Sequence, residues 1–162
     1  SAASDVYKRQ NLRYADENAS DETIQTALEV SQSSEFVNRM PGKLDEPISQ
    51  GGTNVSGGQK QRLSIARALT KNAQIYIFDD TFSALDYATD AKLRTALNAL
   101  IEKTRSTVLI VAQRISTIRN ADKIIVLDKG QISGIGTHDE LMQTCKVYQE
   151  IAYSQLSEEE LA

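Results

Sequence analysis

The sequence predicts an α/β fold: a mostly parallel sheet flanked by helices, preceded by a helical subdomain. Three apolar runs, at 75–78, 108–111 and 124–127, are continuous rather than alternating, which is typical of strands that are covered on both faces. Between the first two runs, apolar residues at 93, 97, 100 and 101 follow one stripe of a helix. A strand, a crossover helix and a second strand form a βαβ unit, in which the two strands run parallel.

The helical subdomain is expected over residues 11–72. Residues 20–40 have helical spacing, with Ser20 placed to cap the first turn, and the tripeptide Met-Pro-Gly ends that pattern. Residues 43–58 contain a proline and two Gly-Gly pairs and are expected to form a loop. Helical spacing returns over residues 59–71.

The C-terminal half of the α/β core is expected over residues 73–156, followed by an acidic tail at 157–162. Residues 130–136 are typical of a short edge strand, and Thr-His-Asp-Glu at 137–140 has the form of a capping box that opens a helix. Because His138 lies inside this box, we expect a structural role for it rather than catalysis or metal binding.

The first ten residues do not fit the rest of the chain. The segment Asp-Val-Tyr-Lys-Arg-Gln back-translates to GATGTGTATAAGAGACAG, which resembles the transposon end used to prepare sequencing libraries. We therefore expect a translated adaptor at residues 1–10 and natural sequence from Asn11. The DNA upstream tests this, since ordinary codons that continue a longer gene would contradict it.

Composition and charge narrow the class of protein. The 162 residues are 40% hydrophobic and 25% charged, as in ordinary globular domains. A net charge of −4 gives no electrostatic basis for nucleic-acid binding. No apolar run reaches the length of a membrane span, so the chain as given is expected to be soluble. Cys145, the single cysteine, has no partner for an internal disulfide.

A glycine-rich turn at the start of a helix is the first candidate site. Ser56, Gly57, Gly58 and Gln59 open the second helical pattern. Glycines allow the backbone to approach a ligand closely, and the N–H groups at a helix start suit a phosphate. A plain glycine turn with a serine cap explains the same four residues, so this motif alone leaves both interpretations open.

A second candidate site follows the strand at 75–78. Asp79 closes this strand, and a carboxylate at the C-terminal end of a parallel strand faces the ligand crevice of an open α/β sheet. It is placed to hold Mg²⁺ through water, as in nucleotide hydrolases, although strand-end aspartates also commonly cap turns. Ser83 and Asp86 follow closely in the chain, and Gln113 ends the next strand.

In this order, the motifs resemble the nucleotide-binding domain of ATP-binding cassette (ABC) transporters of the multidrug-exporter type. Val-Ser-Gly-Gly-Gln at 55–59 is similar to the family's signature, Ile-Tyr-Ile-Phe-Asp at 75–79 to its Walker B strand, and Ser-Ala-Leu-Asp at 83–86 to its D-loop. The resemblance covers nearly all of the chain from Asn11 to Tyr153. It implies an incomplete P-loop NTPase-like ABC ATPase core with an α-helical signature subdomain.

The resemblance also implies ligands and roles. ATP and Mg²⁺ are the expected cofactors, with Asp79 as the residue that holds Mg²⁺ through water. The residues expected to contact ATP are Ser56, Gly57, Gly58, Gln59, Ser83 and Asp86.

Several parts of the family's pattern do not occur in the sequence. The Walker A loop, the adenine-stacking aromatic and the Q-loop would all lie before Asn11, as would a transmembrane domain. We therefore expect the C-terminal portion of an exporter subunit that works at the cytoplasmic face of the cell membrane. Without the lysine and backbone cradle that bind phosphates, this fragment alone is expected to be inactive.

Two substitutions predict a degenerate nucleotide site that turns ATP over slowly. The family's glutamate after the Walker B aspartate orients or deprotonates the attacking water, and here that position is Asp80, which is shorter by one C–C bond of about 1.5 Å. A base must reach its proton within hydrogen-bond distance, and a misplacement of about 1 Å can cost on the order of a hundredfold in rate. The switch histidine is replaced by Gln113, which donates a hydrogen bond but cannot become a cation.

The same substitutions predict a heterodimer. ABC domains dimerise head to tail, so each ATP lies between the Walker motifs of one chain and the signature of the other. Two copies of this chain would form two degenerate sites, whereas a second exporter subunit with glutamate and histidine would gain a fast site closed by this chain's signature. Two alternatives stay open: a non-transport ABC ATPase head, which should carry long coiled-coil heptads, and a catalytically silent dimerisation module.

Overall fold

The structure is a computed structural model that describes residues 6–48 and 54–155. By its contacts the chain divides into two compact units, Ser1–Leu109 and Ile110–Ala162. Each unit is described by itself below.

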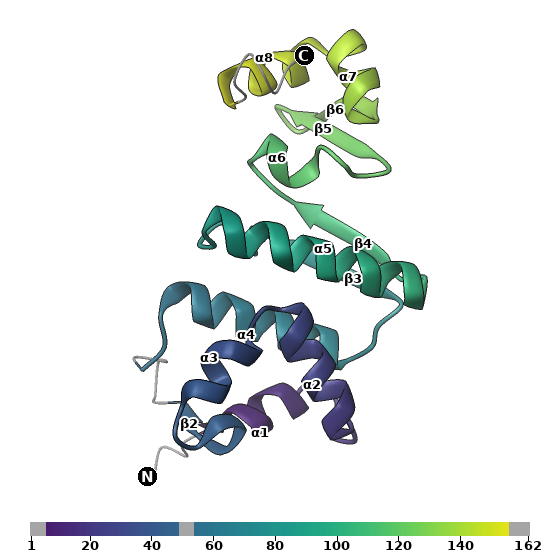
Figure 1. Ribbon diagram of the computed structural model, residues 1–162. Coiled ribbons are helices and arrows are strands. Elements are labelled where there is room, and N and C mark those ends of the chain that lie inside the picture. The colour runs from purple at the N-terminus through teal and green to yellow at the C-terminus, as the bar shows by residue number, and fades with distance from the viewer. Residues whose placement is uncertain (1–5, 49–53, 156–162) are drawn as a thin grey trace. The chain divides into compact units, whose positions relative to one another are not determined.

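The first unit begins with a short strand and a set of helices (Figure 1). Strand β1 (Val6–Tyr7) pairs antiparallel with β2 (Pro47–Ile48). The helices between and after them are α1 (Lys8–Arg13), α2 (Asp21–Val30), α3 (Ser34–Arg39), the 3₁₀ turn η1 (Lys43–Asp45) and α4 (Gly57–Thr70).

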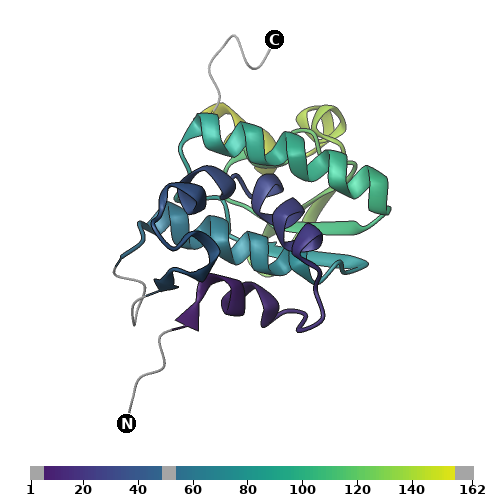
Figure 2. The same cartoon turned by 60° about the horizontal axis from the view of Figure 1, so that its bottom comes forward.

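Helix α4 packs against α1 and α2, and the three are seen side by side in Figure 2. Their facing apolar side chains form the core of this subdomain. The buried residues are Leu12, Ile24, Ala27, Leu28, Leu63, Ile65, Ala66 and Leu69. This burial of one stripe per helix is what the helical spacing of the sequence predicts.

The helix expected over residues 20–40 is two helices, and this part of the prediction was wrong. Gln32 has a left-handed backbone with φ of 58°, and the Ser33 amide donates to the Leu28 carbonyl at 2.7 Å. Ser31 Oγ also donates to the Leu28 carbonyl at 3.1 Å. These bonds close the end of α2, so the chain turns before α3 starts at Ser34.

The expected boundary at residue 10 falls inside helix α1. Lys8 is fully buried, and its Nζ donates to the Glu46 carbonyl at 3.3 Å. Arg9 forms ion pairs with Asp21 and Asp45. The adaptor origin of residues 1–10 stays a prediction for DNA sequencing.

The βαβ unit consists of β3 (Ile75–Asp79), α5 (Tyr87–Thr104) and β4 (Thr107–Val111). The two strands share a sheet. The Thr107 amide donates to the Gln74 carbonyl at 2.8 Å. Because this bond joins the beginnings of both strands, they run parallel, as expected.

Coverage of β3 differs from the expectation of two buried faces. Tyr76 and Phe78 are buried, whereas Ile75 and Ile77 are 63% and 66% exposed. Alternate side chains point to opposite faces of a strand. The described part of the chain therefore covers one face of β3 and leaves the other face apolar and open.

The second unit holds α6 (Ile115–Ile118), β5 (Ile124–Asp128), β6 (Gln131–Gly136), α7 (His138–Thr144) and α8 (Lys146–Gln155). Strands β5 and β6 form an antiparallel hairpin, which confirms the expected strand after Gly130. Lys129 and Gly130 both have positive φ, as a tight hairpin turn requires. The described strands form three separate pairs, of which β3–β4 is parallel and β1–β2 and β5–β6 are antiparallel.

Helices α6, α7 and α8 cover one side of this hairpin. The buried cluster consists of Ile115, Ile124, Val126, Leu141, Cys145, Tyr148 and Ala152. Thr137 and Glu140 form the predicted capping box at the start of α7. The predicted acidic tail at 157–162 lies outside the described residues, as do residues 49–53 of the loop expected over 43–58.

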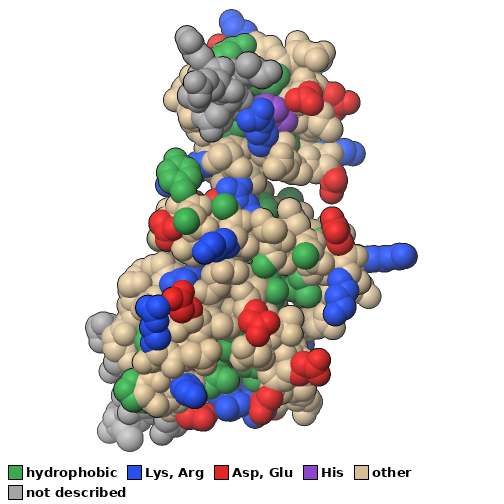
Figure 3. All heavy atoms as spheres, in the orientation of Figure 1, with side chains coloured by type: hydrophobic (Ala, Val, Ile, Leu, Met, Phe, Trp, Pro, Cys, Tyr) green, Lys and Arg blue, Asp and Glu red, His purple; other side chains and the backbone are tan. Residues whose placement is uncertain are grey.

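Across residues 6–48 and 54–155, no helix combines the length and the apolar character needed to cross a bilayer. On the face drawn in Figure 3, acidic and basic side chains are interspersed over the helices of the first unit. This face carries no concentration of positive charge of the kind that binds nucleic acid.

Candidate functional site

Residues 56–59 form a glycine turn with a serine cap, and whether this turn also binds phosphate stays a prediction. The Gln59 amide donates to Ser56 Oγ at 3.2 Å, and Gln59 Oε1 accepts from the Ser56 amide at 2.9 Å. This capping box starts α4 at Gly57, two residues before the sequence pattern indicated. The N–H groups of the first turn, at Gly57 and Gly58, have no acceptor within the helix.

The two glycines differ in their surroundings. A Cβ on Gly57 would meet no atom within 4 Å, whereas a Cβ on Gly58 would lie 3.2 Å from the carbonyl oxygen of Ala84. Gly58 is therefore needed for close approach to the loop after β3. Gly57 faces open space, which leaves the start of α4 accessible to a ligand.

Gln61 connects α4 to the loop at 83–86. This role of Gln61 was not predicted from the sequence. Its Oε1 accepts from the Ala84 amide at 3.1 Å, and its Nε2 approaches Ser83 Oγ at 3.4 Å. Gln61 lies three residues after Gly58, so both face the same side of α4. The helical spacing places Gln61 on that side, but nothing local in the sequence indicates its partner.

Asp79 and Asp80 stand where β3 ends, and both are exposed. Asp80 has a left-handed backbone with φ of 48°, a conformation that aspartate tolerates better than most residues. Ser83 Oγ donates to the Asp80 carbonyl at 3.0 Å, and Thr81 Oγ1 donates to the Asp79 carbonyl at 3.2 Å. These bonds turn the chain sharply and leave both carboxylates facing solvent.

Phe82 anchors this turn from below. Its ring is buried and lies edge-on to Phe78 with centroids 5.6 Å apart. The loop that carries the aspartates is thus fixed to the apolar core by Phe82, as a site on a rigid scaffold requires.

Asp86 is the N-cap of α5. Oδ1 accepts from the Thr89 amide at 2.9 Å and Oδ2 from Thr89 Oγ1 at 2.7 Å. These hydrogen bonds, the amide one first, hold the pKa of Asp86 below its ordinary value. In this state both oxygens of Asp86 are engaged by the helix, so its predicted contact to ATP stays a prediction.

The donor set fits a magnesium ion that is bound mainly through nucleotide phosphates. No group of three or more His, Cys, Asp or Glu side chains able to hold a metal occurs in the described ranges. Mg²⁺ commonly keeps several waters and takes only one or two carboxylates from the protein. The exposed Asp79 carboxylate at the strand end meets that requirement.

Gln113 lies in the second unit, exposed on the segment that joins β4 to α6. Its carbonyl accepts from Gln155 Nε2 at 2.8 Å. In the first unit, the structure brings Gly58 close to Ala84, and Ser83 bonds the main chain of Asp80. It describes Gln113 separately from them.

His138 is buried and bonds Tyr148 Oη through Nδ1 at 2.8 Å. The two rings are edge to face with centroids 5.7 Å apart. The histidine thus joins the start of α7 to α8, as the expectation of a structural role requires.

Comparison with known proteins agrees with the motifs. The family model for ABC transporters matches residues 4–83. An uncharacterized ABC transporter ATP-binding protein of Mycobacterium tuberculosis is 44% identical over 148 residues, which are 90% of this chain and 25% of that protein. The chain belongs to the ABC transporter nucleotide-binding domains. Its α/β fold, with helices and few strands, is the fold of an exporter's ABC domain.

Two further relatives have more specific names. The ATP-dependent lipid A-core flippase of Saccharophagus degradans is 40% identical over 147 residues, 91% of this chain and 25% of that protein. The multidrug resistance ABC transporter ATP-binding and permease protein of Lactococcus lactis is 39% identical over 150 residues, 92% of this chain and 25% of that protein.

A solved structure gives the same result in three dimensions. A bacterial Atm1-family ABC exporter with ATP bound superposes with a TM-score of 0.88 and 32% identity, covering 96% of this chain and 27% of that one. The chain spans about a quarter of the length of these three curated relatives.

Proposed function

We propose that this chain is part of the ATP-binding subunit of an ABC exporter, which couples ATP binding and hydrolysis to transport across a membrane. One observation carries the proposal. The accessible, capped start of α4 is held by Gly58 and Gln61 against the loop that follows the Asp79–Asp80 strand end. The helix start that we propose to bind phosphate is thereby linked, through the loop at Ala84, to the strand that carries the carboxylate we propose for Mg²⁺.

ATP and Mg²⁺ are the proposed ligands. In the head-to-tail arrangement of the family, Ser56, Gly57, Gly58 and Gln59 would face the nucleotide held by a partner. Asp79 would hold Mg²⁺ with the nucleotide of its own subunit, where the ion would offset phosphate charge.

Asp80 and Gln113 support a slow site in this subunit. A carboxylate one methylene shorter than glutamate leaves the attacking water poorly oriented, and an uncharged amide supplies less stabilisation to phosphate charge than a cation. We propose a heterodimer with a second exporter subunit that carries the efficient residues. The expected location of the whole protein is the cytoplasmic face of the cell membrane.

Two exposed apolar faces support a larger ATPase core. One is the open face of β3, Ile75 and Ile77; the other lies on the β5–β6 hairpin, at Ile125, Leu127, Ile132 and Ile135. Contiguous apolar surface of this kind marks a packing site. Segments that the ABC relatives have beyond the matched quarter of their length are the proposed cover.

ATP turnover by the purified full-length subunit, alone and with its partner, tests the proposal. We expect little hydrolysis from the subunit alone and substantial hydrolysis from the pair. Equal, efficient turnover by a homodimer would contradict the slow site. A pair that binds ATP but hydrolyses none would favour the alternative of a silent dimerisation module. Full turnover without any membrane domain would favour a non-transport ATPase head.

A further inference from the structure

We propose that Gln155 is a positioning residue for Gln113: its side-chain amide fixes the main chain on both sides of Arg114. The last turn of α8 then determines the position of Gln113, which replaces the family's switch histidine. The inference rests on the proposed function, because Gln113 faces a nucleotide only in that setting.

The hydrogen bonds form a two-point clamp. Gln155 Nε2 donates to the Gln113 carbonyl at 2.8 Å, and Gln155 Oε1 accepts from the Ile115 amide at 2.9 Å. A carboxamide offers donors on one side and an acceptor on the other. Both sides are used on residues that lie two apart in the chain, so the clamp holds position and orientation together.

The clamp supplies what the local sequence lacks. Ile115 is the first residue of the four-residue helix α6, and its N-cap, Arg114, makes no side-chain capping bond. The N–H of a first helical residue has no acceptor within its own helix. Gln155 provides that acceptor from a segment 40 residues away in sequence.

Ile115 and the part of α8 that precedes Gln155 belong to one packed core. Ile115, Tyr148 and Ala152 are 2%, 1% and 0% exposed and lie in the same buried cluster. Tyr148 and Ala152 lie seven and three residues before Gln155, and their burial fixes the position of α8. Because packed side chains leave little room for movement, α8 holds the amide against the segment 113–115.

Three variants of the full-length subunit, assembled with its partner, separate the two bonds. Gln155→Met removes both at nearly constant volume. Gln155→Glu keeps an acceptor for Ile115 N and loses the donor to Gln113 O. Ser154→Glu is the matched control, because it adds the same charge at the same helix end without touching the clamp. The exposed Ser154 hydroxyl donates to the Ile151 carbonyl at 2.7 Å, within its own helix.

The first readout is hydrogen exchange of the Ile115 amide, resolved by mass spectrometry. We expect exchange to be about fivefold faster in Gln155→Met, the effect of one hydrogen bond. It should stay near wild type in Gln155→Glu and Ser154→Glu. Unchanged protection in Gln155→Met overturns the clamp.

The second readout is photolabelling of this subunit by 8-azido-ATP, competed with ATP or ADP. We expect both Gln155 variants to need an about fivefold higher ATP concentration than wild type to halve the labelling, and an unchanged ADP concentration. The reason is that residue 113 would contact the γ-phosphate, which ADP lacks. Ser154→Glu should match wild type. Normal labelling with an unchanged ATP-to-ADP ratio overturns the positioning role alone. No labelling of the wild-type assembly overturns the proposed function and the role together.

Discussion

The carbonyl oxygen of Ala84 lies 3.2 Å from the point that a Cβ on Gly58 would occupy. Helix α4 and the loop at 83–86 can therefore approach this closely because residue 58 has no side chain. Gln61, one turn further along α4, accepts a hydrogen bond from the Ala84 amide and so stabilises the same contact. Within one subunit, the segment that would face the partner's nucleotide is therefore packed on the loop beside its own Walker B strand.

Alanine at the two signature glycines should separate helix propensity from close packing. Replacing a helical glycine by alanine stabilises a helix by up to about 1 kcal/mol. We expect Gly57→Ala to gain most of this, because its Cβ meets open space, and Gly58→Ala to gain less or lose stability. Urea unfolding of the 162-residue chain measures both. If Gly58→Ala is as stable as Gly57→Ala, the loop at Ala84 moves away from the new Cβ at no measurable cost in stability, which would contradict the close-packing role of Gly58.

Glutamate at 80 and histidine at 113 should speed hydrolysis at the proposed slow site. The pair Asp80→Glu and Gln113→His is expected to raise hydrolysis at this subunit's own site, by up to on the order of a hundredfold. The reason is that the longer carboxylate reaches the attacking water and the imidazole can carry charge. The assay is ATP hydrolysis by the assembled full-length pair in which the partner's own glutamate is replaced by glutamine. Asp80→Asn with Gln113→His is the control, and no gain from glutamate over asparagine would refute the length argument.

The cap of α5 should respond to acid in a defined direction. Hydrogen bonds from Thr89 hold the pKa of Asp86 below its usual value, so the ionised form stabilises the fold above the unfolded pKa of about 4. That contribution is lost as the pH falls through the lower folded-state pKa. Comparing unfolding of wild type and Asp86→Ala from pH 7 to pH 2, we expect a constant gap above about pH 4 that closes below it. A gap that widens in acid would contradict the assignment.

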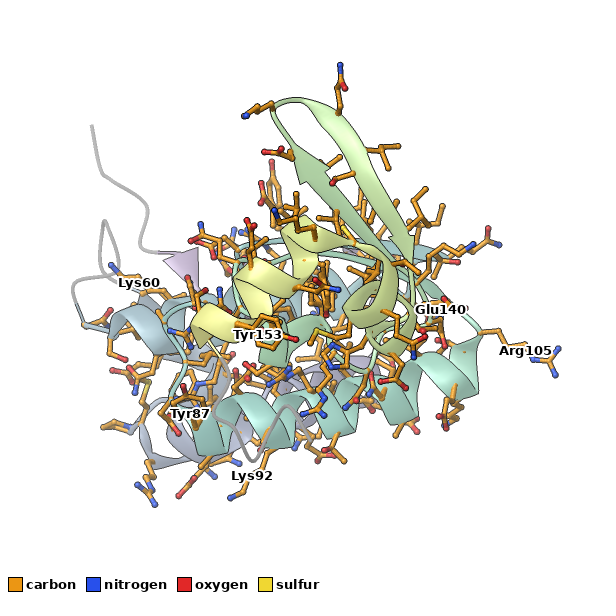
Figure 4. The ribbon with its side chains drawn as sticks, turned by 90° about the horizontal axis from the view of Figure 1, so that it is seen from above. Lys60, Tyr87, Lys92, Arg105, Glu140 and Tyr153 are labelled. Carbon is orange, nitrogen blue, oxygen red and sulfur yellow. The ribbon has the colours of Figure 1, made fainter. Side chains whose placement is uncertain are left out.

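The buried pair of Tyr148 and His138 should contribute to stability and not to catalysis. Tyr148→Phe removes the hydroxyl that bonds Nδ1 and leaves a buried ring nitrogen without that partner, at a cost of about 1–3 kcal/mol. Tyr153, labelled on α8 in Figure 4, is 61% exposed, so Tyr153→Phe is the matched control and should change little. Thermal unfolding of both variants is the measurement. Equal stability of the two would mean that the bond contributes nothing net.

Several local features could be read from the sequence. The caps at Ser20, Ser56, Thr137 and Asp86 each bond an amide three residues ahead, and such bonds depend on neighbouring residues alone. The capping role of Asp86 was not predicted, although its partner Thr89 lies three residues ahead. The strand–helix–strand order was also predicted, since the apolar period changes at each boundary.

The break between α2 and α3 could not be predicted. Gln32 adopts positive φ without a glycine or proline nearby. Its main chain is held from a distance, since Arg62 Nη1 on α4 donates to the Gln32 carbonyl at 2.6 Å and the guanidinium lies 4.9 Å from the Phe36 ring centre. A contact across 30 residues overrides the local helical preference.

The order of the amino acids alone predicts which chemical groups this protein has: the glycine helix start, the strand-end carboxylate, the short Asp80 and the uncharged Gln113. The contacts that hold these groups come from the folded chain, as with Gln61 on Ala84 and Gln155 on residues 113 and 115. The two kinds of contact differ in their range along the chain. A cap is closed by residues three apart, whereas a bond across 23 or 42 residues exists only after packed helices have brought its partners together.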